Sequence, residues 1–194
     1  MAKNILAHKI LIIDFGSQYT QLIARRVREL GVYCEIYSHQ SNLKSIKDFD
    51  AKGIILSGGP ETVKQKGSPK VPIGMFDLGI PILGICYGMQ TITKQLGGKV
   101  ELASKREFGH ANLKISNQGG GLFKNIKDKT TSVWMSHGDH VTDLPKDFKI
   151  IAKSSNSPIA AFYNPTKKIY GLQFHPEVTH TPQGKKILKN FVRD

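Results

Sequence analysis

One short segment of this chain, residues 81–90, constrains the fold more than any other. An apolar run ends there in a Gly-x-Cys-x-Gly turn centred on Cys86, and a helical pattern follows at once. A strand that turns sharply into a helix pushes one side chain outward, and a glycine two residues to either side leaves room for the strained backbone. We therefore expect a buried strand, a corner that presents the Cys86 thiol, and a helix. A small cysteine buried at a strand end is the alternative for this segment taken alone.

Apolar runs alternate with helical patterns in the first half of the chain. The expected helices are residues 19–30, which Gly31 ends, and the helix after Cys86, which continues through residues 91–96 until two glycines stop it. The first expected strand is apolar throughout, as in a strand buried on both faces. Strands that alternate with helices form a parallel sheet. The expected strands are residues 9–14, 32–37, 53–56 and 80–85.

The second half has shorter strand patterns separated by turn residues, which predicts a partly antiparallel arrangement. No internal repeat or linker divides the 194 residues, so we expect one domain, 1–194. The predicted fold class is α/β, a three-layer, flavodoxin-like sandwich with a mostly parallel central sheet and a smaller antiparallel sheet. These later elements are strands at 111–115, 131–135, 149–153, 159–163 and 168–173 and a helix at 184–192.

The chain is strongly basic, with 28 Lys and Arg against 15 Asp and Glu and a net charge of +13. Such a charge requires that a nucleic-acid partner be considered. However, the lysines are scattered, and the sequence has no RNA-binding aromatic motif, helix-turn-helix signature or sustained basic helix. We therefore expect no nucleic-acid partner and keep a non-catalytic nucleic-acid-binding module as a remote alternative. Arg25, Arg26 and Arg28 gather in one segment that could dock a protein partner or an anionic substrate.

Cysteine content and hydropathy exclude several other classes. Only Cys34 and Cys86 occur, without a Cys-x-x-Cys motif or zinc-ligand spacing, so a disulfide scaffold is excluded and we expect no metal site. No segment approaches the run of about 20 apolar residues that spans a membrane, and residues 1–8 lack an apolar signal core. We expect a cytoplasmic protein without a membrane partner.

Cys86 has the features of a catalytic nucleophile. Backbone N–H groups and the positive end of the dipole at a helix start stabilise a thiolate. Such a nucleophile needs a base that also serves as an acid, and the base needs a group that orients it. His175 and Glu177 follow the expected strand 168–173, and residues two apart in an extended segment point to the same side. We therefore predict Cys86 as nucleophile, His175 as general acid and base, and Glu177 as the group that orients His175.

A glycine turn at residues 56–60 supplies a third element. Gly58 and Gly59 follow the buried strand 53–56 directly, and parallel strands deliver their carboxyl ends to the same edge of a sheet. A turn there can present bare N–H groups to an oxyanion that forms on an attacked carbonyl. The candidate donors are the backbone N–H groups of Gly59 and of Tyr87, the residue after the nucleophile. Taken alone, the segment favours an ordinary turn, and its place near the Cys86 corner is what favours the oxyanion role.

Together these motifs resemble the class I glutamine amidotransferases, which carry a Cys-His-Glu triad. Gly-x-Cys-x-Gly, Ser-Gly-Gly-Pro and Phe-His-Pro-Glu occur here in the chain positions that such enzymes use. Longer strings narrow the resemblance to the glutaminase domains of GMP synthetases, and the similarity extends from about residue 8 to residue 194. These strings are residues 14–34, 106–109, 134–139 and 177–181.

The resemblance implies hydrolysis of L-glutamine to glutamate and ammonia through a thioester on Cys86. The ammonia would aminate adenylated XMP on a synthetase domain, giving GMP in purine biosynthesis. Gln90 by itself is also compatible with a solvent-facing helix position, and the segment 136–139 is expected to be a loop. The residues implied to bind the substrate are Gly58, Gln90, Ser136, His137, Gly138 and Asp139.

The chain departs from single-chain GMP synthetases in one respect. The Ser-Gly-Gly-Val-Asp-Ser phosphate loop of their ATP-pyrophosphatase domain does not occur, and residues 57–60 lack the continuation that a phosphate loop needs. We therefore expect no cofactor on this chain, with ATP and Mg²⁺ on a synthetase domain that belongs to the same longer chain or to a second, separate chain. An excised piece is the favoured interpretation. The alternative function is a class I amidotransferase or γ-glutamyl hydrolase that serves another acceptor.

Overall fold

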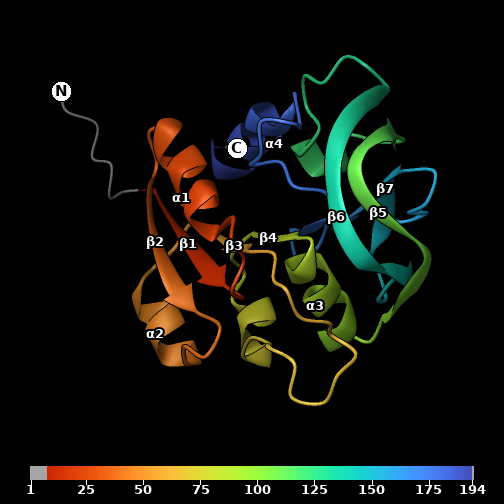
Figure 1. Ribbon diagram of the computed structural model, residues 1–194. Coiled ribbons are helices and arrows are strands. Elements are labelled where there is room, and N and C mark those ends of the chain that lie inside the picture. Colours follow the sequence, from red (N-terminus) through yellow and green to blue (C-terminus); the bar gives the residue numbers. More distant parts are fainter. Residues whose placement is uncertain (1–7, 194) are drawn as a thin grey trace.

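The computed structural model describes residues 8–193, and for residues 104 and 105 the backbone only. Within this range a single nine-stranded sheet runs through the molecule in the order β2-β1-β3-β4-β9-β8-β7-β5-β6 (Figure 1). The strands are β1 (Lys9–Asp14), β2 (Tyr33–Ser38), β3 (Gly53–Leu56), β4 (Ile82–Ile85), β5 (Lys99–Ile115), β6 (Thr130–Asp143), β7 (Lys149–Lys153), β8 (Ala161–Asn164) and β9 (Ile169–Leu172). The helices are α1 (Thr20–Glu29), α2 (Leu43–Asp48), α3 (Tyr87–Gln95) and α4 (Gly184–Arg193).

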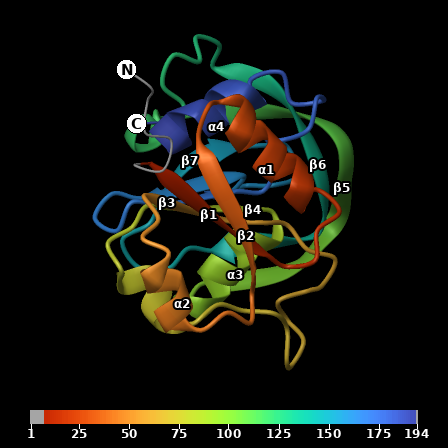
Figure 2. The same cartoon turned by 90° about the vertical axis from the view of Figure 1, so that its left-hand side faces the viewer.

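The first half of the sheet is parallel, as predicted. Strands β2, β1, β3, β4 and β9 all pair in parallel, and the residues between the ends of β1 are fully buried. Ile10 and Ile12 pack on the face that α1 and α4 cover, whereas Leu11 and Ile13 pack on the face that α2 and α3 cover. This alternation follows from the period of two in a strand, and it explains why a continuous apolar run is required. Figure 2 shows the helices on both sides of the sheet, so the predicted three-layer α/β fold is confirmed.

The second half is antiparallel, and it continues the same sheet because β8 pairs with β9. Its largest feature is the hairpin of β5 and β6, whose long strands curve around one side of the molecule (Figure 1). The expected strands 111–115 and 131–135 are only the ends of these two. Residues 99–110 carry five charged side chains, which conceal the alternation of a strand, and the pairing shifts register between Leu102 and Glu107. Helix α2 and the 3-10 turn Ile73–Asp77 were not predicted from the sequence.

The corner between β4 and α3 has the strained geometry that its sequence predicts. Cys86 has φ 51° and ψ −105°, a conformation that non-glycine residues rarely adopt and that persists only where the surroundings enforce it. Both flanking glycines are needed for close approach. A Cβ on Gly84 would lie 2.6 Å from the Gly88 carbonyl carbon, and a Cβ on Gly88 would lie 2.7 Å from the Leu56 Cβ. The strand, the helix and β3 therefore pack too closely at this corner for any larger residue.

Candidate active site

A cavity of about 650 Å³ opens at the carboxyl edge of the parallel strands, between the loop after β1 and the β5–β6 hairpin. Cys86, His175 and Tyr87 line it, together with Gly59 from the loop after β3. Segments far apart in the sequence meet here because parallel strands place their carboxyl ends on one edge. The cavity therefore contains most of the residues that the sequence singled out.

The structure brings the three residues of the predicted triad together. His175 and Glu177 are both buried, and His175 Nδ1 lies 2.7 Å from Glu177 Oε1. The imidazole is also close enough to Cys86 to interact with it electrostatically, and both side chains line the cavity. Gly58 lies between them, since a Cβ built on it would be 3.2 Å from His175 Cε1 and 3.8 Å from Cys86 Cβ. The Tyr19 ring, which the sequence analysis did not assign to the site, stands edge-on to the imidazole at 5.2 Å.

Two separate elements, β6 and α1, and one hydrogen bond within the segment itself fix the backbone around His175. The His175 N–H donates to the Trp134 carbonyl on β6 at 3.0 Å, and the Thr181 hydroxyl donates to the His175 carbonyl at 2.7 Å. From α1, Arg26 Nε donates to the Glu177 carbonyl at 2.9 Å, and its Nη1 pairs with Glu29. Arg26 is therefore committed to the triad segment, which removes it from the exposed basic surface that the sequence suggested.

The electrostatics of the site keep the His175 imidazole protonated. Burial by itself would lower its pKa, because the charged form loses solvation. The Glu177 carboxylate, the hydrogen bond that it accepts and the interaction with Cys86 act in the opposite direction and outweigh burial, so the pKa of His175 lies well above its usual range. A protonated imidazole beside a nucleophile can give its proton to a leaving group.

The two residues that supply the candidate oxyanion donors, Gly59 and Tyr87, lie close together. A Cβ on Gly59 would lie 3.3 Å from the Tyr87 ring and 2.8 Å from the Phe15 carbonyl, so a glycine is required there. Within residues 8–193, neither the Gly59 N–H nor the Tyr87 N–H has a hydrogen-bond acceptor. Two free backbone donors beside a nucleophile are the arrangement that stabilises a developing oxyanion.

Five of the six predicted substrate residues line the cavity, and Gly58 is not among the lining residues. Residues 136–139 belong to β6, so the expectation of a loop is wrong: the hairpin extends to the cavity as a strand. Gln90 is buried, and its Nε2 donates to the Asp139 carbonyl at 2.9 Å, which excludes the solvent-facing alternative. The Cys86 thiol donates to the Ser136 carbonyl at 3.6 Å. His137 and Gly138 line the cavity as well.

Sequence reasoning missed several residues of the site. Gln173 is fully buried, and its Nε2 donates to Cys86 Sγ at 3.7 Å. Its position two residues before His175 in an extended segment could have indicated that it shares the same side of the chain. Leu102 and Phe108 line the cavity on β5 and are 61% and 66% exposed. The charged composition of that segment gave no signal for them.

The polar groups that line the cavity are a thiol, two imidazoles, a guanidinium, hydroxyls, carboxylates and amides. Within residues 8–193, no group of three or more His, Cys, Asp or Glu residues is arranged to hold a metal ion. In the same range, every helix is too short or too polar to cross a bilayer.

Comparison with known proteins agrees with this geometry. The family model "Glutamine amidotransferase class-I" matches residues 11–194. GMP synthase [glutamine-hydrolyzing] from Marinomonas sp. is 55% identical over 201 residues, covering 100% of this chain and 38% of the relative. The corresponding enzyme from Hahella chejuensis is 54% identical over 99% of this chain and 38% of its own length. The chain thus spans little more than a third of the length of these curated relatives.

Solved structures give the same result at the level of the fold. A protein from Thermoplasma acidophilum, provisionally assigned as one of the subunits of a GMP synthase, superposes with a TM-score of 0.84 and 34% identity, over 95% of this chain and 92% of its own. A glutamine amidotransferase from Thermotoga maritima has a TM-score of 0.68 and 23% identity, over 88% and 76% of the two chains, which indicates a shared fold. With its sequence, fold and cavity in agreement, this chain belongs to the class-I glutamine amidotransferase family.

Proposed function

We propose that this chain hydrolyses L-glutamine to glutamate and ammonia with Cys86 as nucleophile, His175 as general acid and base, and Glu177 as the residue that orients His175. One observation carries the proposal. A cysteine held in a strained corner faces a buried imidazole that is paired at 2.7 Å with a buried carboxylate, in a chain of the class-I glutamine amidotransferase family. A purely structural cysteine does not need this conformation or these partners.

In the proposed reaction, Cys86 first attacks and later leaves, and His175 first donates a proton and later accepts one. The Cys86 thiolate attacks the carboxamide carbon of glutamine, and the oxyanion that forms accepts hydrogen bonds from the Gly59 and Tyr87 N–H groups. His175 then gives its proton to the departing nitrogen, so that ammonia leaves and a glutamyl thioester remains. The neutral imidazole next takes a proton from water, whose oxygen attacks the thioester carbon and expels the thiolate. Glutamate is released, and no cofactor takes part.

For substrate binding, we propose that the glutamine α-amino and carboxylate groups contact the β6 segment 136–139 and the Gly58 turn. The Gln90 side chain supports this subsite through its hydrogen bond to the Asp139 carbonyl. Carbonyl oxygens suit an ammonium group and N–H donors suit a carboxylate, and both kinds of group occur on this segment. The cavity volume of about 650 Å³ leaves ample room for one amino acid.

For the ammonia, we propose delivery to a synthetase domain that aminates adenylated XMP to GMP and that carries the ATP and Mg²⁺ sites. The support is that relatives 54–55% identical to this chain are GMP synthases [glutamine-hydrolyzing] and that this chain covers only 38% of their length. The exposed apolar side chains of Leu102 and Phe108 beside the cavity are suited to contact with such a domain. Whether the two parts share one polypeptide stays a prediction, as does the cytoplasmic location.

The test combines chemical labelling with product analysis. A glutamine-like electrophile such as 6-diazo-5-oxonorleucine should modify Cys86 alone, and Cys86→Ala should abolish the label and glutamate release. Cys34 provides an internal control, because it is buried and desolvation raises the pKa of its thiol. Labelling of both cysteines, or of neither, would contradict the proposed nucleophile.

The acceptor is tested separately by adding a synthetase domain with XMP, ATP and Mg²⁺ and following GMP by mass spectrometry. GMP that depends on both glutamine and Cys86 supports the full proposal. Glutamine hydrolysis without GMP would favour an amidotransferase that serves another acceptor. Salt-dependent binding of generic DNA or RNA, together with no thiol chemistry, would favour the nucleic-acid-binding alternative.

A further inference from the structure

A buried acid–base pair lies behind the proposed glutamine subsite and takes no part in the chemistry described above. Glu107 on β5 and His137 on β6 stand directly opposite each other in the hairpin, and their side chains are only 5% and 2% exposed. His137 Nε2 lies 3.2 Å from Glu107 Oε2, and His137 Nδ1 lies 2.9 Å from the Asp139 carbonyl oxygen. The hydroxyl of Ser154 lies 3.1 Å from both carboxylate oxygens.

The partners of His137 determine where its protons are. A carbonyl oxygen only accepts, so Nδ1 carries a proton and donates to Asp139. The other nitrogen faces a carboxyl oxygen, and without a proton between them two lone pairs would oppose each other in a buried site. Burial lowers the pKa of His137, and the neighbouring Glu107 only partly offsets this. A hydrogen bond between Nε2 and Oε2 at 3.2 Å requires one proton shared between the two groups.

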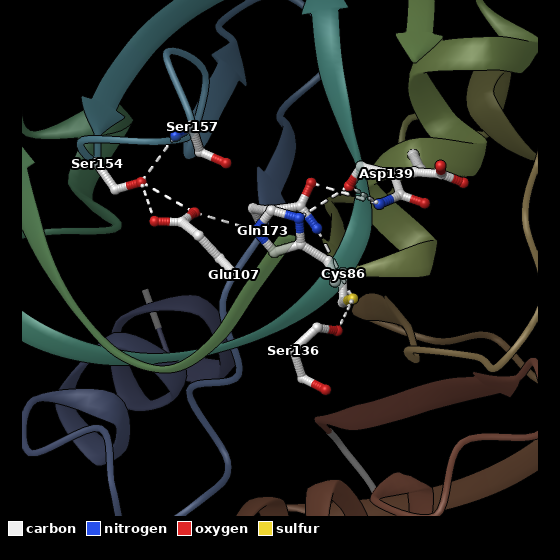
Figure 3. A network of polar contacts seen from close by, with 9 residues as sticks. Cys86, Glu107, Ser136, Asp139, Ser154, Ser157 and Gln173 are labelled. Atoms are coloured by element: carbon white, nitrogen blue, oxygen red, sulfur yellow. Dashed lines mark hydrogen bonds and ion pairs between the residues drawn. The ribbon is translucent and has the colours of Figure 1, made fainter. Parts of the chain in front are cut away.

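The network continues from this pair to the nucleophile, as Figure 3 shows. The Asp139 carbonyl, which accepts from His137, also accepts from Gln90 Nε2 at 2.9 Å. Gln90 Nε2 lies 3.4 Å from Gln173 Oε1, and Gln173 Nε2 donates to Cys86 Sγ at 3.7 Å. A change at Glu107 can therefore alter the position of the Asp139 carbonyl, whereas the triad residues have their own anchors on α1 and β6.

The position of the pair in the hairpin indicates what it holds. The β5–β6 register is irregular between Leu102 and Glu107, so the backbone ladder alone does not fix the strands on that side. Glu107 and His137 are the first regular pair after this irregularity, and His137 lies within the segment 136–139 that lines the cavity. A shift of one residue would turn that segment to the opposite face of the strand.

We propose that Glu107 is a positioning residue for glutamine binding, which acts through His137 to hold the β6 segment 136–139 in the conformation that binds the substrate. This inference rests on the proposed glutaminase function. Glu107 itself does not line the cavity, although its neighbours Arg106 and Phe108 do, so its effect on the substrate is indirect. Its contribution is a hydrogen bond that carries one shared proton, not a net charge.

Three substitutions distinguish a hydrogen bond from a charge. Glu107→Gln preserves the reach, because its amide can donate to His137 Nε2 while its oxygen accepts from the Ser154 hydroxyl. Glu107→Asp preserves the charge but is one methylene too short for the 3.2 Å contact. Glu107→Leu removes both. Glu101→Gln and Glu101→Asp are the matched controls, since Glu101 lies on the same strand and is exposed.

The readouts are KM and kcat for L-glutamine, and the glutamine concentration that halves the rate of Cys86 alkylation by iodoacetamide. We expect Glu107→Leu and Glu107→Asp to raise KM at least tenfold, and to raise equally the glutamine concentration that halves Cys86 alkylation. The value of kcat should stay within about threefold of wild type. Glu107→Gln should restore both to within about threefold. If Glu107→Leu does not fold, the comparison between the Gln and Asp variants still decides.

Each contrary result has one meaning. The positioning role would be overturned by an unchanged KM in the Asp or Leu variants, or by a Gln variant as impaired as these. A fall in kcat at constant KM would overturn it as well. A wild-type protein that neither hydrolyses glutamine nor is protected by it would instead contradict the proposed function. The Glu101 variants should match wild type, and a similar rise in KM there would overturn the specific role of Glu107.

Discussion

The Glu177→Gln substitution is the most direct test of how the structure tunes the imidazole. In the wild type, Glu177 Oε1 pairs with His175 Nδ1 at 2.7 Å, and this carboxylate is the largest of the influences that raise the pKa of His175. A glutamine keeps an oxygen that accepts from Nδ1 but removes the charge. Hydrogen bonds to charged groups contribute about 1.5–3 kcal/mol and neutral ones about 0.5–1.5 kcal/mol, so roughly 1–1.5 kcal/mol is lost.

That loss should appear in the pH dependence of glutamine hydrolysis. One pKa unit corresponds to about 1.4 kcal/mol, so the pKa of His175 should fall by about one unit in Glu177→Gln. Ammonia departure needs the imidazolium, and activity declines as pH rises through the pKa of His175. The alkaline limb of kcat/KM should therefore move to lower pH by about one unit, with roughly a tenfold loss of kcat/KM on the alkaline side.

The same substitution affects stability in a pH-dependent way. Since the pKa of His175 is raised in the folded state, the pair stabilises the fold fully below the ordinary histidine pKa of about 6.5, and this contribution is lost as pH rises through the higher folded value. Denaturant unfolding of the wild type should show this decline, and Glu177→Gln should show less of it. Glu177 Oε2 is buried without a hydrogen-bond partner among residues 8–193, so the new amide would lack an acceptor and cost about 1–3 kcal/mol.

A coincident alkaline limb in the wild type and Glu177→Gln would refute this reasoning, because Glu177 would then not hold the proton on His175. Unfolding curves that lose stability equally across the whole pH range would show that the substitution only disturbs packing. Glu177→Ala provides the upper limit for the loss of stability at this position. Removing one partner of a buried ion pair costs about 3–5 kcal/mol, so its effect on stability should exceed that of the glutamine variant.

Two further substitutions test the scaffold. Gly88→Ala should destabilise the fold by about 1–3 kcal/mol in denaturant unfolding, since a Cβ there would lie 2.7 Å from the Leu56 Cβ and overpack the corner; wild-type stability would show that the helix can move away. Arg26→Gln should lower kcat/KM about tenfold, because it removes a charged donor worth about 1.5 kcal/mol or more from the Glu177 carbonyl. Arg25→Gln, at a side chain that is 75% exposed, is its control, and equal effects of the two would contradict the role of Arg26.

The sequence determined the parallel half of the fold and the corner that presents Cys86. Strands β1 and β3 have the predicted bounds, because apolar runs that are buried on both faces have a strong local signature. Gly31 ends α1 with φ 73°, as expected of a residue that adopts this conformation easily. Cys86 was found for a similar reason, since the chemistry of a tight corner requires glycines at fixed spacing.

Tertiary structure alone decided how the antiparallel half completes the site. The charged residues at 99–110 conceal a strand whose stability comes from pairing with β6, and no local pattern indicates such long-range pairing. The same pairing places Glu107 against His137 and brings the Asp139 carbonyl to Gln90. These two contacts join residues that are 30 and 49 positions apart in the sequence. Such contacts depend on the register of the strands, and the register depends on the packing of the whole sheet. The sequence could name the reacting groups, whereas only the assembled sheet fixes the surfaces that hold a substrate beside them.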